Sequence, residues 1–269
     1  MFMISGGNGA AGVLSAAEWR RYVRQTCLPE IGEHGQAAWK RARILLVGVG
    51  GLGSVSAMYL CAAGIGHLRI VEPDVVSESN LQRQVLYTQA EVGRSKAVCA
   101  AERLRALNPY ADIEAHAVAF DRDNALALAG GCDLIVDGTD GRAVRYLLDT
   151  VSVGLGIPYA YAAIANFQGQ VGVWNADAAA PIYRDLFPES ELPADIPAPP
   201  GVIGPLPGVA AAWQTWEVLA YLCGARRRSA GDLLCFDLLG GAQYRVQVPA
   251  DPLRRAEAET DFARLKAGM

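Results

Sequence analysis

A glycine-rich segment at residues 48–53 (GVGGLG) constrains the fold of this chain more than any other feature. The apolar run at residues 43–47 (RILLV) precedes it, and an Ala- and Leu-rich segment at residues 52–63 follows it. This order predicts a strand, a tight turn and a helix. Glycines let the backbone of such a turn approach a phosphate group closely, and the first turn of the helix supplies free N–H groups. The segment therefore predicts a nucleotide-binding turn.

The rest of the N-terminal half alternates between predicted strands and predicted helices. Strands are expected at residues 68–72, 113–119, 133–137 and 158–163, and helices at residues 95–107 and 142–155. Several of these strands are continuous apolar runs, which is typical of a parallel sheet covered by helices on both faces.

The pattern changes after Asn166. Residues 170–174, 233–238 and 244–248 alternate in the manner of antiparallel strands, and a helix is expected between them at residues 209–223. We therefore expect an α/β fold with a Rossmann-like mixed sheet. Its N-terminal strands are expected to be parallel and its C-terminal strands antiparallel, with helices on both faces.

The chain is expected to form a single domain at residues 15–269, preceded by a flexible N-terminus at residues 1–14. Ser15 and Glu18 have the spacing of a helix-capping box, so we expect a first helix to begin there and to end near Pro29. Residues 178–207 contain eight of the fourteen prolines, which predicts a long irregular crossover loop.

Charge, hydropathy and cysteine spacing argue against several classes of function. A net charge of −4 leaves no basic field to hold a phosphate backbone, so we expect no nucleic acid partner. No apolar run reaches the roughly 18 residues that a membrane helix needs, so we expect a soluble, cytoplasmic protein without a membrane partner. The six cysteines form no C-x-x-C pair, which argues against a zinc knuckle or a redox dithiol.

Glu72 lies at the end of the second predicted strand, where an acidic side chain can accept hydrogen bonds from ribose hydroxyls. The glycine turn and Glu72 together fit an NAD-linked oxidoreductase as well as any other nucleotide-binding enzyme. The deciding residues follow the second and fourth strands, where a dinucleotide oxidoreductase would not need them. They are Asn80, Arg83, Gln84, Lys96 and Asp140.

A family resemblance rests on residues 21–25 (RYVRQ), 48–53 (GVGGLG), 79–84 (SNLQRQ), 93–96 (GRSK) and 137–140 (DGTD). In the order and spacing of these motifs, the chain resembles the ThiF/MoeB/HesA adenylyltransferases, which are relatives of ubiquitin-activating enzymes. The resemblance implies ATP-dependent adenylation of the C-terminal glycine carboxylate of a ubiquitin-like sulfur-carrier protein that ends in Gly-Gly, which activates the carrier for thiocarboxylate formation. Adenylation of a different carboxylate or of an RNA substrate is one alternative, an NAD-linked oxidoreductase is a second, and a catalytically silent nucleotide-binding scaffold is a third.

The resemblance also implies ATP and Mg²⁺ as cofactors and assigns roles to residues of this chain. Arg83 and Lys96 would grip the phosphates of ATP, and Asp140 would hold the Mg²⁺ ion. Arg24 would reach into the ATP site of a neighbouring subunit, so we expect a homodimer. The other residues expected to bind the nucleotide are Gly48, Gly50, Gly51, Leu52, Gly53, Glu72, Asp74, Asn80 and Gln84.

The chain departs from the resembling enzymes in its cysteines. Many of those enzymes bind structural zinc through two C-x-x-C pairs, but residues 182–185, at the place of the first pair, contain no cysteine, and the C-terminus lacks the second pair. We therefore expect no zinc. Pro197 occupies the approximate place of a cysteine in the crossover loop, so this loop cannot form a thioester or an acyl disulfide there. A separate sulfurtransferase or other sulfur donor is then expected to receive the acyl-adenylate.

Overall fold

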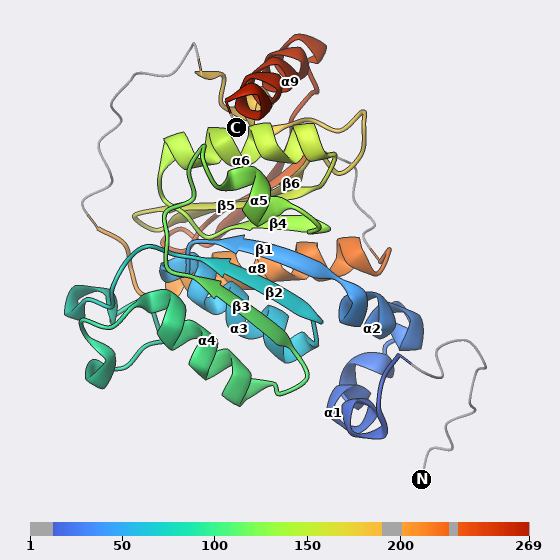
Figure 1. Ribbon diagram of the computed structural model, residues 1–269, viewed down its shortest axis with the longest axis vertical. Helices are drawn as coiled ribbons and strands as arrows, with labels where there is room; N and C mark the ends of the chain where they lie inside the picture. The colour runs from blue at the N-terminus through green and yellow to red at the C-terminus, as the bar shows by residue number, and fades with distance from the viewer. Residues whose placement is uncertain (1–12, 190–200, 226–230, 269) are drawn as a thin grey trace.

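The computed structural model describes residues 13–189, 201–225 and 231–268, and a sheet of eight strands runs through its centre (Figure 1). The strand order is β3-β2-β1-β4-β5-β6-β7-β8. The strands are β1 (Arg43–Val47), β2 (His67–Val71), β3 (Asp112–His116), β4 (Leu134–Asp137), β5 (Tyr159–Ala165), β6 (Gln168–Trp174), β7 (Asp232–Asp237) and β8 (Ala242–Gln247). The N-terminal segment that the sequence predicts to be flexible lies outside the described residues, except for residues 13 and 14.

The sheet changes from parallel to antiparallel at β5. The strands from β3 to β5 in the sheet order pair in parallel, and those from β5 to β8 pair antiparallel. The mixed α/β sheet predicted from the sequence is therefore confirmed. The arrangement brings the carboxyl ends of β1, β2 and β4 to the same edge of the sheet, which is where doubly wound sheets bind their ligands.

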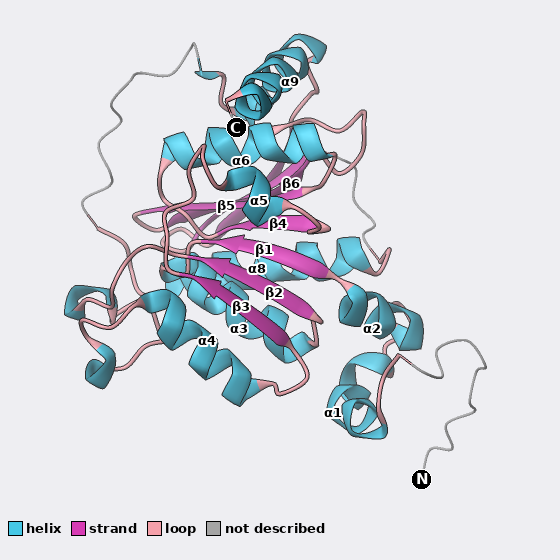
Figure 2. Ribbon diagram, viewed as in Figure 1, coloured by secondary structure: helices cyan, strands magenta, loops and turns pink. Residues whose placement is uncertain are grey.

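Helices cover both faces of the sheet, as the sequence predicts. They are α1 (Ala16–Thr26), α2 (Gly32–Arg41), α3 (Gly51–Ala63), α4 (Lys96–Leu107), α5 (Ala125–Ala129), α6 (Arg142–Leu155), α7 (Tyr183–Leu186), α8 (Pro205–Leu222) and α9 (Pro252–Ala267), with short 3-10 turns η1 (Glu78–Asn80) and η2 (Gln89–Glu91). Figure 2 shows α3, α4 and α8 on one face of the sheet and α5 and α6 on the other. α9 lies outside α6, where Gly154 leaves room for the ring of Phe262.

The central strand β1 shows why the sequence requires a layer on each side. Ile44 and Leu46 belong to the core formed with α3, α4 and α8, whereas Leu45 and Val47 belong to the core formed with α5 and α6. All four side chains are buried. Burying an aliphatic side chain of this size contributes roughly 1.5–3 kcal/mol, so both layers stabilise the position of the strand.

Several elements differ from the prediction. The sequence does not predict α2, α5, α7 or α9. α8 begins at Pro205 instead of residue 209, because the fixed φ of proline suits the first turn of a helix. The expected crossover loop at residues 178–207 is therefore interrupted by α7 and overlaps the start of α8, while its residues 190–200 lie outside the described residues. β3 is shorter than expected, because its pairing with β2 ends where His116 lies opposite Val71.

In the parts of the chain that the structure describes, no helix combines the length and the apolar character that a membrane crossing requires. The cysteines are all free. Cys61, Cys99, Cys132 and Cys235 are buried, and Cys27 is exposed. Most of the cysteines therefore lie in the core.

Candidate active site

The glycine turn begins where β1 ends, and its backbone leaves no room for a β-carbon at Gly48 or Gly53. Gly48 has a φ of +87°, and a Cβ at this position would lie 2.8 Å from the carbonyl oxygen of Gly138, just after β4. A Cβ on Gly53 would collide with the carbonyl oxygen of Gly48. The turn leads into α3, whose N-cap residue Gly50 supplies no side-chain cap. The first N–H groups of this helix are therefore open to an anion.

Side chains hold the middle of the turn. The N–H group of Val49 donates to Oε2 of Glu72 at 2.8 Å, and the hydroxyl group of Tyr87 donates to the carbonyl oxygen of Val49 at 2.8 Å. Glu72 is only 5% exposed, and its Oε1 accepts a hydrogen bond from the N–H group of Asp74 at 3.0 Å. The carboxylate that the sequence predicts as a ribose acceptor therefore also supports the backbone of the turn.

Arg83 and Gln84 lie against the turn, although they come from a different part of the chain. The carbonyl oxygen of Asn80 accepts hydrogen bonds from the N–H groups of Arg83 at 3.0 Å and Gln84 at 2.9 Å, which forms a compact bend after η1. A Cβ on Gly51 would lie 3.6 Å from Cδ of Arg83, and one on Gly50 would lie 3.4 Å from Nε2 of Gln84. The structure thus brings both predicted residues to the glycine turn.

Gln84 carries an unsatisfied polar atom. The residue is 4% exposed, and its Oε1 has no hydrogen-bond partner among the described residues. A buried carbonyl oxygen without a partner costs free energy that a bound ligand can recover. This atom is therefore suited to accept a hydrogen bond from a nucleotide.

Lys96 is the first residue of α4 and points its ammonium group at Asp74. Nζ donates to Oδ2 of Asp74 at 3.1 Å, and the Lys96 N–H group donates to the Asp74 carbonyl oxygen at 3.0 Å. Because Asp74 also binds Glu72, hydrogen bonds connect Lys96 to the glycine turn through two carboxylates. The predicted residues Glu72, Asp74 and Lys96 therefore form one group beside the turn.

Asp140 follows β4 on a loop that is tightly held. Asp137 is buried and accepts hydrogen bonds from the N–H and hydroxyl groups of Thr139, from Arg145 and from Tyr159. Arg145 also donates to the carbonyl oxygen of Thr139 at 2.7 Å. Asp140 is exposed just beyond this network. Its loop borders the glycine turn, since a Cβ on Gly48 would lie 3.1 Å from the N atom of Thr139.

Arg24 is separated from these residues. It is exposed on α1, and α1 is anchored by hydrogen bonds from Arg21 to the Leu107 carbonyl oxygen and from Gln25 to the Ala63 carbonyl oxygen. Leu107 and Ala63 are the last residues of α4 and α3, so α1 lies at the opposite end of these helices from the glycine turn (Figure 1). Within one chain, Arg24 does not join the site.

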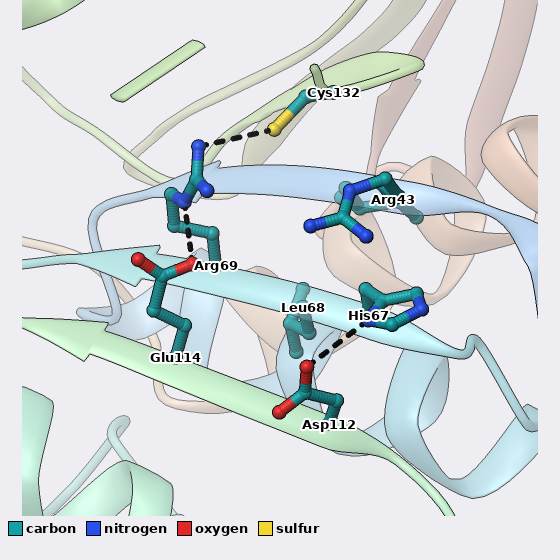
Figure 3. A pocket seen from close by; sticks show the side chains of 8 residues that line it. Arg43, His67, Leu68, Arg69, Asp112, Glu114 and Cys132 are labelled. Carbon is teal, nitrogen blue, oxygen red and sulfur yellow. Dashed lines mark hydrogen bonds and ion pairs between the residues drawn. The ribbon is translucent and has the colours of Figure 1, made fainter. Parts of the chain in front are cut away.

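A hollow at the amino ends of β1, β2 and β3 offers a second candidate site. Figure 3 shows its charged and polar lining, which includes Arg43, His67, Arg69, Asp112, Glu114 and Cys132. His67 pairs with Asp112 at 3.1 Å, and Arg69 pairs with Glu114 at 2.7 Å. These pairs satisfy most of its charges within the sheet. The hollow is also at the wrong end of the strands for a ligand of a doubly wound sheet.

A family model and close relatives match this architecture and these motifs. The model of the ThiF family matches residues 22–256. The chain belongs to the ThiF family. A sulfur carrier protein adenylyltransferase from Thermus thermophilus is 42% identical to this ThiF-family chain over 87% of the chain and 89% of its own length. Adenylyltransferase and sulfurtransferase MOCS3 of Mus musculus is also 42% identical over 87% of the chain, but the match spans only 51% of the mouse protein.

Solved structures show the same fold at lower identity. The crystal structure of PaaA superposes with a TM-score of 0.78 at 21% identity, covering 92% of this ThiF-family chain and 79% of that protein. The crystal structure of Escherichia coli MccB in complex with ATP has a TM-score of 0.73 at 20% identity, covering 87% of this chain and 73% of that chain. At these identities the likeness establishes the fold alone.

Two residues of this ThiF-family site are missing from the sequence prediction. Tyr87 lies in the same segment as Arg83 and Gln84, and Arg145 lies on α6, shortly after the Asp137–Asp140 motif. Proximity to these motifs is the only signal that the sequence offers for either residue. Tyr87 binds the carbonyl group of Val49, which is distant in sequence, and Arg145 binds the carbonyl group of Thr139 in the loop after β4.

Proposed function

We propose that this ThiF-family chain uses ATP to adenylate the C-terminal glycine carboxylate of a ubiquitin-like sulfur-carrier protein. The observation that carries the proposal is the position of Arg83 and Gln84 against Gly50 and Gly51. These side chains add a cation and an amide to a turn whose N–H groups favour phosphate. A dinucleotide oxidoreductase does not need that cation. The name of the Thermus thermophilus relative supports the same activity.

Adenylation requires cations next to the phosphates. An oxygen of the carrier carboxylate forms a bond to the α-phosphorus of ATP, and the bond from that phosphorus to the oxygen leading to the β-phosphate breaks. The products are an acyl-adenylate and pyrophosphate, so negative charge develops on the departing group. Arg83 and Lys96 are the residues that we assign to this charge, Arg83 as a planar fork and Lys96 as a compact point charge.

Lys96 is suited to exchange its partner when ATP binds. Its side chain is 5% exposed, whereas the side chain of Asp74 is 66% exposed. A phosphate oxygen can therefore replace the Asp74 carboxylate, which turns into solvent at little cost. A buried ammonium group that keeps an anionic partner in both states avoids the cost of an unpaired buried charge.

Asp140 fits a Mg²⁺ ion because it is an exposed carboxylate, a hard oxygen ligand, beside the glycine turn. In residues 13–189, 201–225 and 231–268, no group of three or more His, Cys, Asp or Glu side chains gathers to hold a metal ion. The ion would therefore complete its ligands with nucleotide phosphates and water, which is how Mg²⁺ is commonly bound. Bound Mg²⁺ supplies positive charge to the phosphates. Arg145 and Asp137 hold the loop that carries Asp140.

The carrier tail would approach along the segment that returns from the crossover. Gly204 lies against the carbonyl oxygen of Gln82, and Pro207 lies against Gly51, so this segment passes beside the phosphate turn. Because Pro197 stands in the approximate place of the crossover cysteine, we assign sulfur transfer to a separate sulfurtransferase or other sulfur donor. The name of the mouse relative includes both activities, and this chain spans about half of that protein.

A homodimer would complete the site. Arg24 is exposed on α1, which lies at the opposite end of α3 and α4 from the glycine turn of the same chain, so a second copy of the chain would have to present it to the nucleotide. The proposal thus includes a trans contribution of Arg24 to the phosphates.

Carrier-dependent exchange between labelled pyrophosphate and ATP tests the proposed function. We expect exchange with a carrier that ends in Gly-Gly and none with the same carrier lacking its last glycine. Arg83→Ala should reduce exchange by about 10²-fold or more, as expected for a charge-stabilising group. Arg103→Ala is the matched control, because Arg103 is a half-exposed arginine on the outside of α4 paired with Glu91.

The same assay separates the alternatives. Exchange that depends on another carboxylate or on RNA, but not on any Gly-Gly carrier, would show that the protein adenylates that substrate and not a carrier. An absence of exchange together with tight NAD binding would instead favour the oxidoreductase.

A further inference from the structure

We infer that Tyr87 is a positioning residue of the nucleotide site, because its hydroxyl group fixes the peptide that aims the Gly50 N–H group at the phosphates. The inference rests on the proposed use of ATP and adds to it a residue outside the phosphate-contacting set. Tyr87 acts through the backbone of Val49 and does not itself touch the nucleotide.

Two side chains determine how the turn is oriented. The Val49 N–H group donates to Oε2 of Glu72, and the Val49 carbonyl oxygen accepts from the Tyr87 hydroxyl group, each at 2.8 Å. Val49 is wholly buried. Both of its backbone polar groups therefore receive partners from side chains of other segments. Glu72 and Tyr87 therefore both anchor the turn at the same residue, Val49.

Because the peptide bond is planar, the contact that fixes the Val49 carbonyl group also fixes the direction of the Gly50 N–H group. In a trans peptide, the carbonyl group of one residue and the N–H group of the next point in opposite directions. The described residues contain no cis peptide bond. Because Tyr87 holds the Val49 carbonyl group toward the core, the N–H group of Gly50 points away from the core. Gly50 is also the N-cap of α3, so its N–H group points out at the positive end of this helix.

Glu72 complements this arrangement at the preceding peptide. By binding the Val49 N–H group toward the core, it directs the Gly48 carbonyl group the opposite way. Glycine at position 50 can rotate its backbone freely in the absence of such anchors. The side chains of Glu72 and Tyr87 therefore preorganise a turn whose glycines do not by themselves restrict its backbone conformation.

The surroundings of Tyr87 keep its hydroxyl group in the donor role. The residue is 6% exposed, and its ring belongs to the same core cluster as Val49. Burial raises the pKa of Tyr87 far above its ordinary value, and the nearby Glu72 carboxylate acts in the same direction. The hydroxyl group therefore stays protonated. The same short segment supplies Arg83 and Gln84, so it positions the turn and also lines it.

Calorimetric binding of three probes to the full chain tests the inference: ATP, inorganic tripolyphosphate and adenosine. Tyr87→Phe removes the hydroxyl group and leaves the ring in the core. We expect it to weaken the binding of ATP and of tripolyphosphate by the same factor, about fivefold, which corresponds to the net contribution of one hydrogen bond. The affinity for adenosine should not change, since the N–H groups of the turn contact only phosphates.

Tyr221→Phe is the matched control. The Tyr221 hydroxyl group donates to the carbonyl oxygen of Ala176 at 3.0 Å, near the C-terminal end of α8, so the same atom and the same kind of bond are removed. Pro207, near the start of that helix, is the part that approaches Gly51. Tyr221→Phe should lower thermal stability in a similar way and leave the affinity for all three probes unchanged.

The outcomes separate this inference from the proposed function. Wild-type affinity for ATP and tripolyphosphate in Tyr87→Phe overturns the positioning role alone. The inference is also overturned if Tyr221→Phe weakens the binding of ATP and tripolyphosphate equally, or if Tyr87→Phe weakens the binding of adenosine. A general loss of stability would then account for the result. A wild-type chain that binds neither ATP nor tripolyphosphate overturns the proposed function as well.

Hydrogen exchange on the wild-type protein provides a test that does not depend on a folded variant. Tripolyphosphate should slow the exchange of the Gly50 amide, because that N–H group points at the ligand. Exchange at Gly50 that is unaffected by saturating tripolyphosphate contradicts the orientation on which the inference is built.

Discussion

The ammonium nitrogen of Lys96 lies 3.1 Å from Oδ2 of Asp74, and the two partners differ sharply in exposure, with side chains 5% and 66% accessible. The cation is fixed at the start of α4, whereas its carboxylate partner can move into solvent. Such a pair supplies a positive charge that is available to an incoming phosphate without being unpaired beforehand. Lys96 is therefore the residue on which we expect the chemical step to depend most.

Replacement of this cation should affect activity more than stability. We expect Lys96→Met to lower kcat for carrier-dependent pyrophosphate exchange by about 10²–10³-fold, because charge that develops on the phosphates loses a preorganised partner. The melting temperature should change little, since Asp74 remains solvated. Lys266→Met on the exposed side of α9 controls for the loss of a lysine. Retention of near wild-type kcat by Lys96→Met would rule out its role at the phosphates.

Asp140 should set the Mg²⁺ requirement. Asp140→Asn removes the negative charge and keeps the size of the side chain, so we expect the Mg²⁺ concentration at half-maximal exchange to rise by about tenfold or more. Asp123→Asn, at another exposed position that follows a strand and precedes a helix, is the control. A Mg²⁺ titration measures the effect. An unshifted titration in Asp140→Asn would show that the ion does not use this carboxylate.

Complementation between two inactive variants tests whether Arg24 acts in trans. Arg24→Ala and Lys96→Ala should each be inactive as pure proteins. In a mixture unfolded and refolded together, half of the dimers carry one of each chain and hence one intact site, so about a quarter of the wild-type activity should return. Activity that stays at the level of the separate variants would contradict the trans assignment.

The buried acid Asp149 should make stability depend on pH. It accepts from the Tyr183 N–H group at 2.8 Å and lies 3.3 Å from Nε of Arg184. Burial raises the pKa of Asp149 to about 7, although Arg184 acts in the opposite direction. Between its unfolded pKa near 3.8 and this value, the native chain holds a proton that the unfolded chain has released, so stability falls as pH rises through this window.

Urea unfolding of wild type and Asp149→Asn at several pH values measures this dependence. The amide cannot ionise but keeps an oxygen to accept from Tyr183, so the decline between about pH 4 and 7 should become shallower. Parallel curves for the two proteins would show that Asp149 ionises in the folded chain as it does in the unfolded chain.

Much of the fold follows from local sequence signals. α6 has the boundaries that the sequence predicts, and the parallel strands lie where continuous apolar runs are bounded by turn residues. The sequence does not predict α2, because its glycines and missing N-cap weaken the local signal. That helix is held by tertiary contacts, such as the bond from Trp39 Nε1 to the Leu219 carbonyl oxygen at 2.8 Å.

The site also combines residues that local motifs identify with residues whose contacts depend on the folded sheet. Arg83 and Gln84 are identified by their motif, and the structure places them at the glycine turn. The hydrogen bond that Glu72 accepts from the Val49 N–H group requires the end of β2 to lie beside the end of β1, which no local pattern specifies. Tyr87 and Arg145 are missed for the same reason. They bind carbonyl groups whose positions are fixed only by the folded sheet.

Intact mass spectrometry of a Gly-Gly carrier incubated with this protein, ATP and Mg²⁺ is the most direct test of the account. We predict that the carrier gains the mass of one adenylyl group, that pyrophosphate is released in equal amount, and that Arg83→Ala suppresses both. A carrier that stays unmodified while the wild-type protein binds ATP would contradict the central claim.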